Sequence, residues 1–335
     1  MTEINLCPTR GLKKRRVLIG LATATVFFHA PASAQDAYPS KPITMVVPFP
    51  PGGAADIAAR PVAEAMGRYL KQPVIVENKA GAGGGIGMSQ VAKAKSDGYT
   101  VLMALSSVVV LPEADAIRQR RPMFELAQLE PIARFTADPV VLVVKADSPW
   151  KNFEQFAAAL RARPGEHTFG SSGNYGTMHV PFEQLNAAAK TSMLHVPFTG
   201  AAPAVVALLG GQVDALATGP STVAGHIQAG KLRALAHWGE GTIPTLPEVP
   251  SLKKSGVPVT YLQWTGLFAP ASTPTAIATK LREAAKFAAS DVRAARSLEA
   301  AGTYMQYLDT PEFTAFVAKD AQAMAKVVQR IGKVE

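Results

Sequence analysis

The alternation of short β-rich runs with Ala-rich helical stretches is the feature that most constrains the fold of this 335-residue chain. Several β-rich runs are continuously apolar, as buried strands of parallel sheets are. Strands that alternate with helices form βαβ units, so the pattern predicts an α/β protein with mostly parallel sheets flanked by helices. The expected strands are Ile43–Val47, Val74–Glu77, Thr100–Leu105, Val140–Lys145, Thr168–Gly170, Met193–Val196, Val213–Ala217 and Leu232–Ala236. The expected helices are Ala54–Leu70, Gly87–Lys95, Phe153–Arg163, Thr177–Ala188, Pro203–Leu209, Ser221–Ala229, Pro274–Ala289, Asp291–Ala300 and Pro311–Ile331.

Two proline-rich stretches interrupt this rhythm. Residues 112–135 hold three prolines and the charged run Arg118–Arg121, and residues 239–261 hold four prolines. Each stretch has a suitable length for a crossing between domains. We therefore predict two domains, of which the first is discontinuous and the second is inserted into it. They are residues 38–135 plus 238–335, and residues 136–237.

The first residues have the pattern of a secretory signal peptide. Lys13–Arg16 form a positive segment, Val17–His29 an apolar segment, and Ala32–Ala34 a small-residue cleavage site. The apolar segment is too short to cross a bilayer core of roughly 30 Å. We expect residues 1–34 to be removed by cleavage after Ala34 and the mature chain to be exported, by ordinary secretion or by a twin-arginine route. The single cysteine, Cys7, precedes the cleavage site, so the mature chain has no thiol for a disulfide, a nucleophile or a metal.

The charge balance bears on the partner. Lys and Arg number 34 against 25 Asp and Glu, and the net charge of +9 first suggests a polyanionic partner. Residues 1–34 contribute five basic side chains and one acidic, which is +4, so 9 − 4 = +5 remains on the mature chain. Aromatic residues make up only 7% of the sequence, and no basic stripe has aromatics interleaved with it. We therefore expect no nucleic-acid partner.

Polar, glycine-rich loops follow several of the expected strands. In open parallel sheets, ligands bind outside the carboxyl ends of the strands. Gly, Ser, Thr and Asn offer backbone N–H and hydroxyl groups to a small anion, and none of these loops carries Lys or Arg. The set predicts a site for a small polar ligand built from uncharged groups, although each loop alone is also typical of a simple turn. The loops are residues 48–53, 106–107, 170–177, 198–202 and 218–221.

The motifs for catalysis, cofactors and metals are incomplete. Gly81–Gly87 resembles a phosphate loop, but an isoleucine stands at the third glycine position of the dinucleotide pattern and no Lys-Ser/Thr follows. Gly170–Asn174 departs from a nucleophile elbow at its fifth residue, and the histidines lack the spacing of a metal site. We expect no enzymatic activity, no cofactor and no metal. The alternative that stays open is an exported serine-dependent hydrolase that uses Ser172 or Ser107 with His179.

A series of motifs, in order, covers essentially the whole mature chain. They are Tyr38–Ile43, Val46–Gly53 with Asp56 and Arg60, Val76–Gly84, Asp97–Thr100, Gly170–Asn174, His195–Gly200, Gly211–Asp214 and Ala229–Leu235. Together they resemble the Bug-type solute-binding receptors of tripartite tricarboxylate transporters.

This resemblance implies a periplasmic, monomeric two-domain clamshell of the type II periplasmic-binding-protein class, without enzymatic activity. Such a receptor captures a small carboxylate between its domains and delivers it to the permease subunits of a tripartite tricarboxylate-type transporter. A ligand-sensing role beside a signalling partner stays open. The ligand-binding residues that the resemblance implies are Phe49, Gly52, Gly53, Ser106, Ser107, Ser172, Asn174, Gly176, Thr177, Thr199, Ala201 and Thr218.

Two departures from the family pattern bear on the ligand. Tyr175 is an extra residue where the family usually has Asn-Gly-Thr, and Thr218 stands at a position that is commonly Asp. The loss of that carboxylate removes a partner for a ligand ammonium group. The expected ligand is therefore an acid without an amine, such as a di- or tricarboxylate, or an aromatic acid with Tyr175 beside its ring. Asp56 is expected to cap the first helix and to pair with Arg60 inside it.

Overall fold

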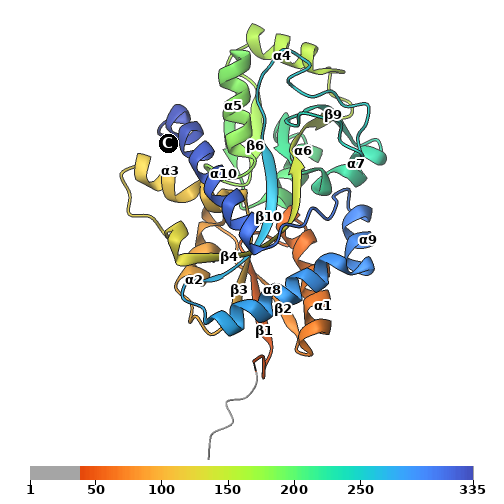
Figure 1. Ribbon diagram of the computed structural model, residues 1–335. Coiled ribbons are helices and arrows are strands. Elements are labelled where there is room, and N and C mark those ends of the chain that lie inside the picture. The colour runs from red at the N-terminus through yellow and green to blue at the C-terminus, as the bar shows by residue number, and fades with distance from the viewer. Residues whose placement is uncertain (1–37, 335) are drawn as a thin grey trace, which may run out of the picture. The chain divides into compact units, whose positions relative to one another are not determined.

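Residues 38–334 are described by a computed structural model, and the predicted signal peptide lies outside the described residues. Their strands form two separate five-stranded sheets (Figure 1). The first sheet has the order β2-β1-β3-β10-β4, and the second has the order β7-β6-β8-β5-β9. The strands of the first sheet are β1 (Ile43–Val47), β2 (Val74–Asn78), β3 (Thr100–Leu105), β4 (Leu129–Pro139) and β10 (Leu262–Pro270). Those of the second are β5 (Val141–Lys145), β6 (Thr168–Ser171), β7 (Leu194–Pro197), β8 (Ala215–Thr218) and β9 (Leu232–His237).

Four strands of each sheet run in one direction and the fifth is reversed. β10 lies antiparallel between β3 and β4, and β5 lies antiparallel between β8 and β9, whereas the other neighbours are parallel. A strand that follows another through a helical crossover lies parallel to it in the same sheet. β5 and β10 instead enter their sheets from the other sheet, after β4 and β9 respectively. The prediction of an α/β protein with mostly parallel sheets is confirmed, with this one reversal in each sheet.

Helices connect most of the strands. α8 packs on α1, and α10 packs on β4 of the first sheet and on α5, the helix that follows β6 of the second sheet (Figure 1). None of the helices within residues 38–334 is long and apolar enough to span a membrane. The α-helices are α1 (Ala54–Leu70), α2 (Gly85–Ala92), α3 (Leu111–Ile117), α4 (Phe153–Ala162), α5 (His179–Ala189), α6 (Ala201–Leu209), α7 (Ala224–Gln228), α8 (Thr275–Ser290), α9 (Val292–Ala300) and α10 (Thr310–Ile331). Short 3₁₀ turns are η1 (Ala82–Gly84), η2 (Ser106–Val109), η3 (Leu126–Gln128) and η4 (Pro220–Thr222).

Three elements lie where no element is expected from the sequence: β4, β10 and α3. β4 contains Pro131 and ends at Pro139, and proline is a poor residue for a central strand because it cannot donate to the ladder. The structure accommodates it because β4 is an edge strand. β10 contains Gly266 and the polar Gln263, which weaken its apolar pattern. Both strands obtain their stability from each other and from the helices that cover them.

The core around β10 is aromatic. Phe313 of α10 is fully buried against Trp264 and Phe268, with ring centroids 5.6 and 5.3 Å away. Gly266 lies between these two strand residues, and a Cβ built on it would be 2.3 Å from the Phe313 ring. The absence of a side chain at Gly266 therefore lets α10 pack closely on the sheet.

Candidate functional site

The loop after β1 is held at the start of α1 by the Asp56 carboxylate. Asp56 accepts hydrogen bonds from Gly52 N (3.0 Å), from Arg60 Nε and Nη2 (3.0 and 2.8 Å) and from Asn78 Nδ2 (2.9 Å). The predicted pairing of Asp56 with Arg60 within the first helix is confirmed. The expected cap is wrong, because Gly53 is the N-cap of α1 and no side chain caps it. Asn78 Nδ2 also donates to Phe49 O at 2.9 Å, so one carboxylate and one amide tie this loop to α1 and to β2.

The Asp56 carboxylate lies in the first turn of α1 and is nearly buried. Its side chain is 5% exposed, and burial alone raises the pKa of this carboxyl. The hydrogen bonds from Arg60, Gly52 and Asn78 outweigh burial and hold the pKa below its usual value. Because the Gly52 N–H already donates to Asp56, this amide is engaged within the protein.

The glycine-rich turn before α2 supports two predicted site residues. Ser107 Oγ donates to Gly83 O at 3.2 Å. A Cβ on Gly84 would fall 2.9 Å from Cζ of Phe49, and Gly84 has φ 103°, in the region that favours glycine. The turn therefore positions both the Ser107 hydroxyl and the Phe49 ring, and it does so by backbone contacts that a side chain would block.

The loop after β6 is built from short local hydrogen bonds. Gly173 N donates to Ser171 Oγ at 3.0 Å, and Tyr175 N donates to His179 Nδ1 at 3.2 Å. His179 N in turn donates to Gly176 O at 3.0 Å, at the first turn of α5. These contacts fix the loop at the carboxyl end of β6.

Tyr175 is enclosed by the protein. It is 1% exposed and adopts the left-handed backbone region with φ 57°. Its hydroxyl donates to Gly332 O at 2.7 Å and accepts from Val334 N at 2.8 Å. The residue that is extra relative to the family pattern thus ties the loop after β6 to the segment after α10.

Two buried histidines lie behind this loop. The rings of His179 and His195 are 4.3 Å apart, and Phe169 stacks on His195 at 5.0 Å. Burial, reinforced by His195, lowers the pKa of His179 to about 3, and burial lowers the pKa of His195 to about 4. His195 Nε2 lies 2.5 Å from Ser171 Oγ. Both rings are neutral near pH 7, so they brace the loop and supply no positive charge.

The loops of the two sheets touch each other. A Cβ built on Gly200, in the loop after β7, would lie 2.3 Å from Cδ of Pro50 in the loop after β1. A Cβ on Gly173 would lie 3.0 Å from Gly83 N. The loops after β6 and β7 of the second sheet therefore contact the loops after β1 and β2 of the first sheet, and a glycine lies at each of these close contacts.

A buried polar cluster lies between β4, β10 and the loop after β8. The hydroxyls of Thr136 and Thr265 are 2.9 Å apart, and Thr303 donates to the Asp138 carboxyl. Burial raises the pKa of Asp138 to about 6, against the lowering effect of the Thr303 hydrogen bond. Gln263 Oε1 has no hydrogen-bond partner within the described residues. The space here is ≈ 10 Å³, about the size needed for one water molecule.

A larger cavity of ≈ 660 Å³ opens beside the loop contacts. Leu111, Arg118 and Met123 line it from the α3 region, and Asn174 and Thr199 line it from the second sheet. Its size is in the range typical of small-molecule sites. The cavity therefore provides room for a solute next to the loops that were predicted to bind one.

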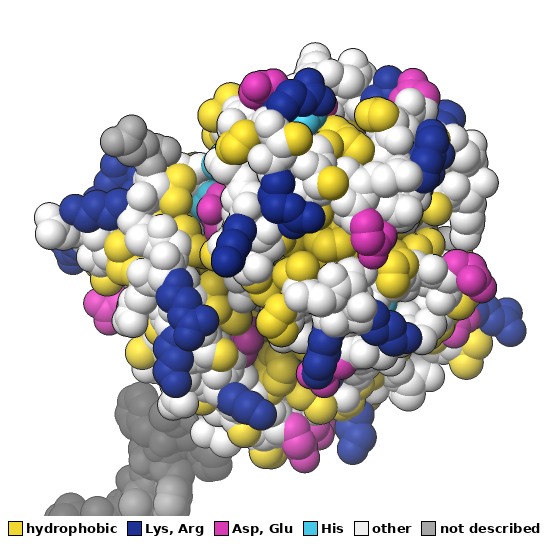
Figure 2. Space-filling model, turned by 90° about the horizontal axis from the view of Figure 1, so that it is seen from above, with side chains coloured by type: hydrophobic (Ala, Val, Ile, Leu, Met, Phe, Trp, Pro, Cys, Tyr) yellow, Lys and Arg dark blue, Asp and Glu magenta, His cyan; other side chains and the backbone are white. Residues whose placement is uncertain are grey.

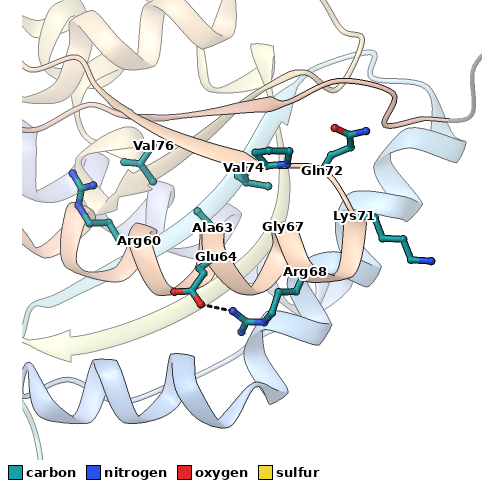
Figure 3. A pocket seen from close by; sticks show the side chains of 10 residues that line it. Arg60, Ala63, Glu64, Gly67, Arg68, Lys71, Gln72, Val74 and Val76 are labelled. Atoms are coloured by element: carbon teal, nitrogen blue, oxygen red, sulfur yellow. Dashed lines mark hydrogen bonds and ion pairs between the residues drawn. The ribbon is translucent and has the colours of Figure 1, made fainter.

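Another cavity, of ≈ 570 Å³, runs along α1 and β2 (Figure 3). Both of its arginines are already paired: Arg60 with Asp56 at 2.8 Å, and Arg68 with Glu64 at 2.6 Å and Asp291 at 2.7 Å. No predicted site residue lines it. On the face shown in Figure 2, Lys and Arg are scattered among acidic and apolar side chains and form no continuous patch.

The structure divides the predicted ligand residues into two groups. Asn174, Tyr175 and Thr199 line the ≈ 660 Å³ cavity. The others lie in loops and at strand ends and do not line this cavity: Phe49, Gly52, Gly53, Ser106, Ser107, Ser172, Gly176, Thr177, Ala201 and Thr218. Ser172 Oγ is the most informative of these, since it is buried and has no hydrogen-bond partner within residues 38–334. Thr218 Oγ1 instead pairs with Thr222 Oγ1 at 2.9 Å.

Of the side chains that the hydrolase alternative requires, Ser107 and His179 are engaged elsewhere, and Ser172 makes no hydrogen bond to His179 within residues 38–334. Ser107 donates to a backbone carbonyl, and His179 Nδ1 accepts from Tyr175 N. The short Ser171–His195 contact involves a fully buried serine hydroxyl. Among the described residues, no group of three His, Cys, Asp or Glu side chains is arranged to hold a metal.

Arg118 and Arg120 are the basic residues among the cavity residues that the sequence does not predict. Both follow α3, in the stretch interpreted only as a crossing between domains. Pro112 at the start of α3, followed by Glu113, is a typical helix start and was an available signal for this element. That the segment lies beside the loop after β6 is not visible in the sequence.

Two α/β sheets whose strand-end loops face each other beside a solute-sized cavity define the class of solute-binding receptors. The chain matches the family model described as tripartite tricarboxylate transporter family receptor over residues 58–333, and it belongs to this family of periplasmic solute-binding receptors. The resemblance to the Bug-type receptors is thereby confirmed.

Relatives support the same assignment. The UPF0065 protein in the tcbD-tcbE intergenic region of Pseudomonas sp. strain P51 is 39% identical over 278 residues, which is 82% of this chain and 82% of that protein. Protein BugT of Bordetella pertussis is 36% identical over 319 residues, which is 94% of this chain and 96% of that protein.

Solved structures agree with the fold. The periplasmic binding protein BugD has a TM-score of 0.82 and 30% identity, with 88% of this chain and 98% of that chain covered. MatC of Rhodopseudomonas palustris with bound malate has a TM-score of 0.81 and 28% identity, with 87% and 100% covered. An R. palustris protein with adipate has a TM-score of 0.81 and 25% identity, with 88% and 98% covered.

Proposed function

We propose that this receptor captures a small carboxylate without an amine, a di- or tricarboxylate or an aromatic acid, between its two sheets. It delivers this solute to the permease subunits of a tripartite tricarboxylate-type transporter. The two predicted domains, residues 38–135 plus 238–335 and residues 136–237, close on the solute by a hinge at the segments that cross between the sheets. Residues 1–34 direct the chain to the periplasm and are cleaved after Ala34.

The meeting of the strand-end loops carries this proposal. They bring hydroxyl and backbone N–H groups from both sheets to one place, and Ser172 Oγ is buried there without a partner. A buried polar group without a hydrogen bond costs about 1–3 kcal/mol, which a ligand oxygen at Ser172 would relieve. The bound malate and adipate of the two R. palustris proteins support a carboxylate as this ligand.

Thermal unfolding of the purified chain with a panel of acids tests the proposal. A solute at 100 times its Kd adds about 2.7 kcal/mol to the free energy of unfolding and raises the unfolding midpoint. We expect this rise with at least one carboxylate that lacks an amine, and none with sugars. Midpoints that stay constant across all the acids, or that rise only with aspartate and glutamate, contradict the proposal.

The Gly200→Ala variant tests whether the loops must meet for binding. The added Cβ would lie 2.3 Å from Pro50, so the loops cannot approach as they do here, while the extended backbone at Gly200 (φ 170°) accepts alanine. We expect the affinity for the acid to fall at least about tenfold with little change in the unliganded midpoint. Gly241→Ala is the control, because a Cβ there meets nothing within 4 Å.

A further inference from the structure

The α3 region places two cationic side chains at the ≈ 660 Å³ cavity, beside loops that carry no basic residue. Arg118 and Arg120 both line it, and the Arg118 guanidinium carbon is 5.9 Å from the centre of the Tyr175 ring. Among the ion pairs and side-chain hydrogen bonds of the described residues, none involves Arg118 or Arg120. These guanidinium groups are available to an anion from solution.

The acidic side chain at the same cavity does not neutralise them. Asp115 accepts a hydrogen bond from Met123 N at 3.2 Å and makes no ion pair with either arginine. Two guanidinium groups against one carboxylate leave a net positive charge at this wall of the cavity. Guanidinium binds carboxylate through paired N–H donors, with both geometry and charge in its favour.

Apolar side chains occupy the wall near the arginines. Leu111 and Phe124 are buried and face the cavity, and Phe198 lines its other side. Asn174 and Thr199 supply polar groups at the second-sheet side, next to the loop that holds Ser172. The lining of the cavity thus combines uncharged polar groups, apolar side chains and two guanidinium groups.

We propose that the solute of this receptor is an elongated diacid with an apolar spacer. One carboxylate is held by the loop around Ser172 and Asn174, and the second is held by Arg118 and Arg120. This inference rests on the proposed function and narrows it, because a cavity of ≈ 660 Å³ is far larger than a short diacid fills. Arg118 and Arg120 are then the residues that select a second, distant carboxylate.

Calorimetric titration with succinate, adipate, suberate and octanoate tests the inference. In the unaltered chain, we expect affinity to increase from succinate to suberate, and suberate to bind at least tenfold more tightly than octanoate, which has one carboxylate. In the Arg118→Gln/Arg120→Gln double variant, suberate affinity falls at least about tenfold, to the level of octanoate, whose affinity is unchanged. Arg121→Gln is the matched control, since Arg121 belongs to the same basic run, is exposed and does not line the cavity.

The outcomes separate this inference from the proposed function. If the acids bind all three chains equally, or if succinate binds most tightly, the inference is overturned and the carboxylate receptor stands. If none of these four acids binds any of the chains, the inference is overturned, whereas the proposed function is overturned only if the thermal-unfolding panel, which also holds tricarboxylates and aromatic acids, gives no shift either. The unliganded unfolding midpoint of each variant shows that it is folded, and both arginines lack ion pairs whose loss would destabilise it.

Discussion

At the scale of single residues, Asp56 is the anchor of the first ligand loop. It joins the loop after β1, the first turn of α1 and β2 through four hydrogen bonds, although it is nearly buried. A buried carboxylate in this position is stable only because all its donors are in place. Its role is structural, and its removal affects the site by releasing the loop.

Asp56→Asn is expected to lower both stability and ligand affinity. The lost charge weakens the hydrogen bonds from Arg60 and Gly52. The asparagine side chain also carries an NH₂ group, which cannot accept the hydrogen bonds that these donors make to Asp56. We expect a loss of about 2–3 kcal/mol in the free energy of unfolding, measured with urea at pH 7. Arg60→Gln is the comparison and should cost less than Asp56→Asn, because the Arg60 side chain is 54% exposed and the N–H donors of Gly52 and Asn78 stay on the Asp56 carboxylate. Equal losses in the two variants would contradict this assignment.

At the scale of elements, the contact between β10 and α10 holds the end of the chain on the first sheet. Gly266 provides the space that Phe313 fills, and the neighbouring Trp264 donates to Asp320 of the same helix at 2.7 Å. The helix continues from this contact to α5 and to the tail that binds Tyr175. A change at Gly266 is therefore a change in how a whole helix packs.

Gly266→Ala is expected to destabilise the protein by about 1–3 kcal/mol, the usual cost of overpacking a core. The Phe313 ring cannot move away easily, because Trp264 and Phe268 enclose it. Chemical denaturation monitored by tryptophan fluorescence measures the loss. Gly225→Ala should not destabilise, since a Cβ there meets nothing within 4 Å and Gly225 lies in α7. Unchanged stability in Gly266→Ala would show that α10 shifts without cost.

At the scale of the whole molecule, buried titratable groups make stability depend on pH in opposite senses. The pKa of His179 is lowered to about 3. Its contribution to the free energy of unfolding is therefore complete above pH 6.5 and is lost as the pH falls toward 3, because the unfolded chain binds the proton more tightly. The pKa of Asp138 is raised to about 6, so its contribution is lost as the pH rises from about 4 through 6.

His179→Asn isolates the first of these effects. The asparagine oxygen can accept the Tyr175 N–H in place of Nδ1 but does not titrate. The stability advantage of the unaltered chain over the variant should shrink between pH 6.5 and pH 5, by up to about 1.4 kcal/mol per pH unit. Urea unfolding at these two pH values measures it, and Asp138→Asn should change the pH dependence in the opposite direction. An advantage that does not change with pH would contradict neutral burial of His179.

The sequence by itself determined the α/β class, eight of the strands and the loops that gather at the strand ends, because these depend on local periodicity and turn chemistry. Only the tertiary structure decided the rest. β4 and β10 are stable as strands through their neighbours, the Tyr175 hydroxyl is bonded to the tail after α10, and Arg118 and Arg120 line the same cavity as Asn174. These are contacts between residues far apart in the chain, which local patterns do not encode. The physical reason is that the charge available to a solute depends on which side chains remain unpaired at the cavity, and pairing is settled only when the whole chain has folded.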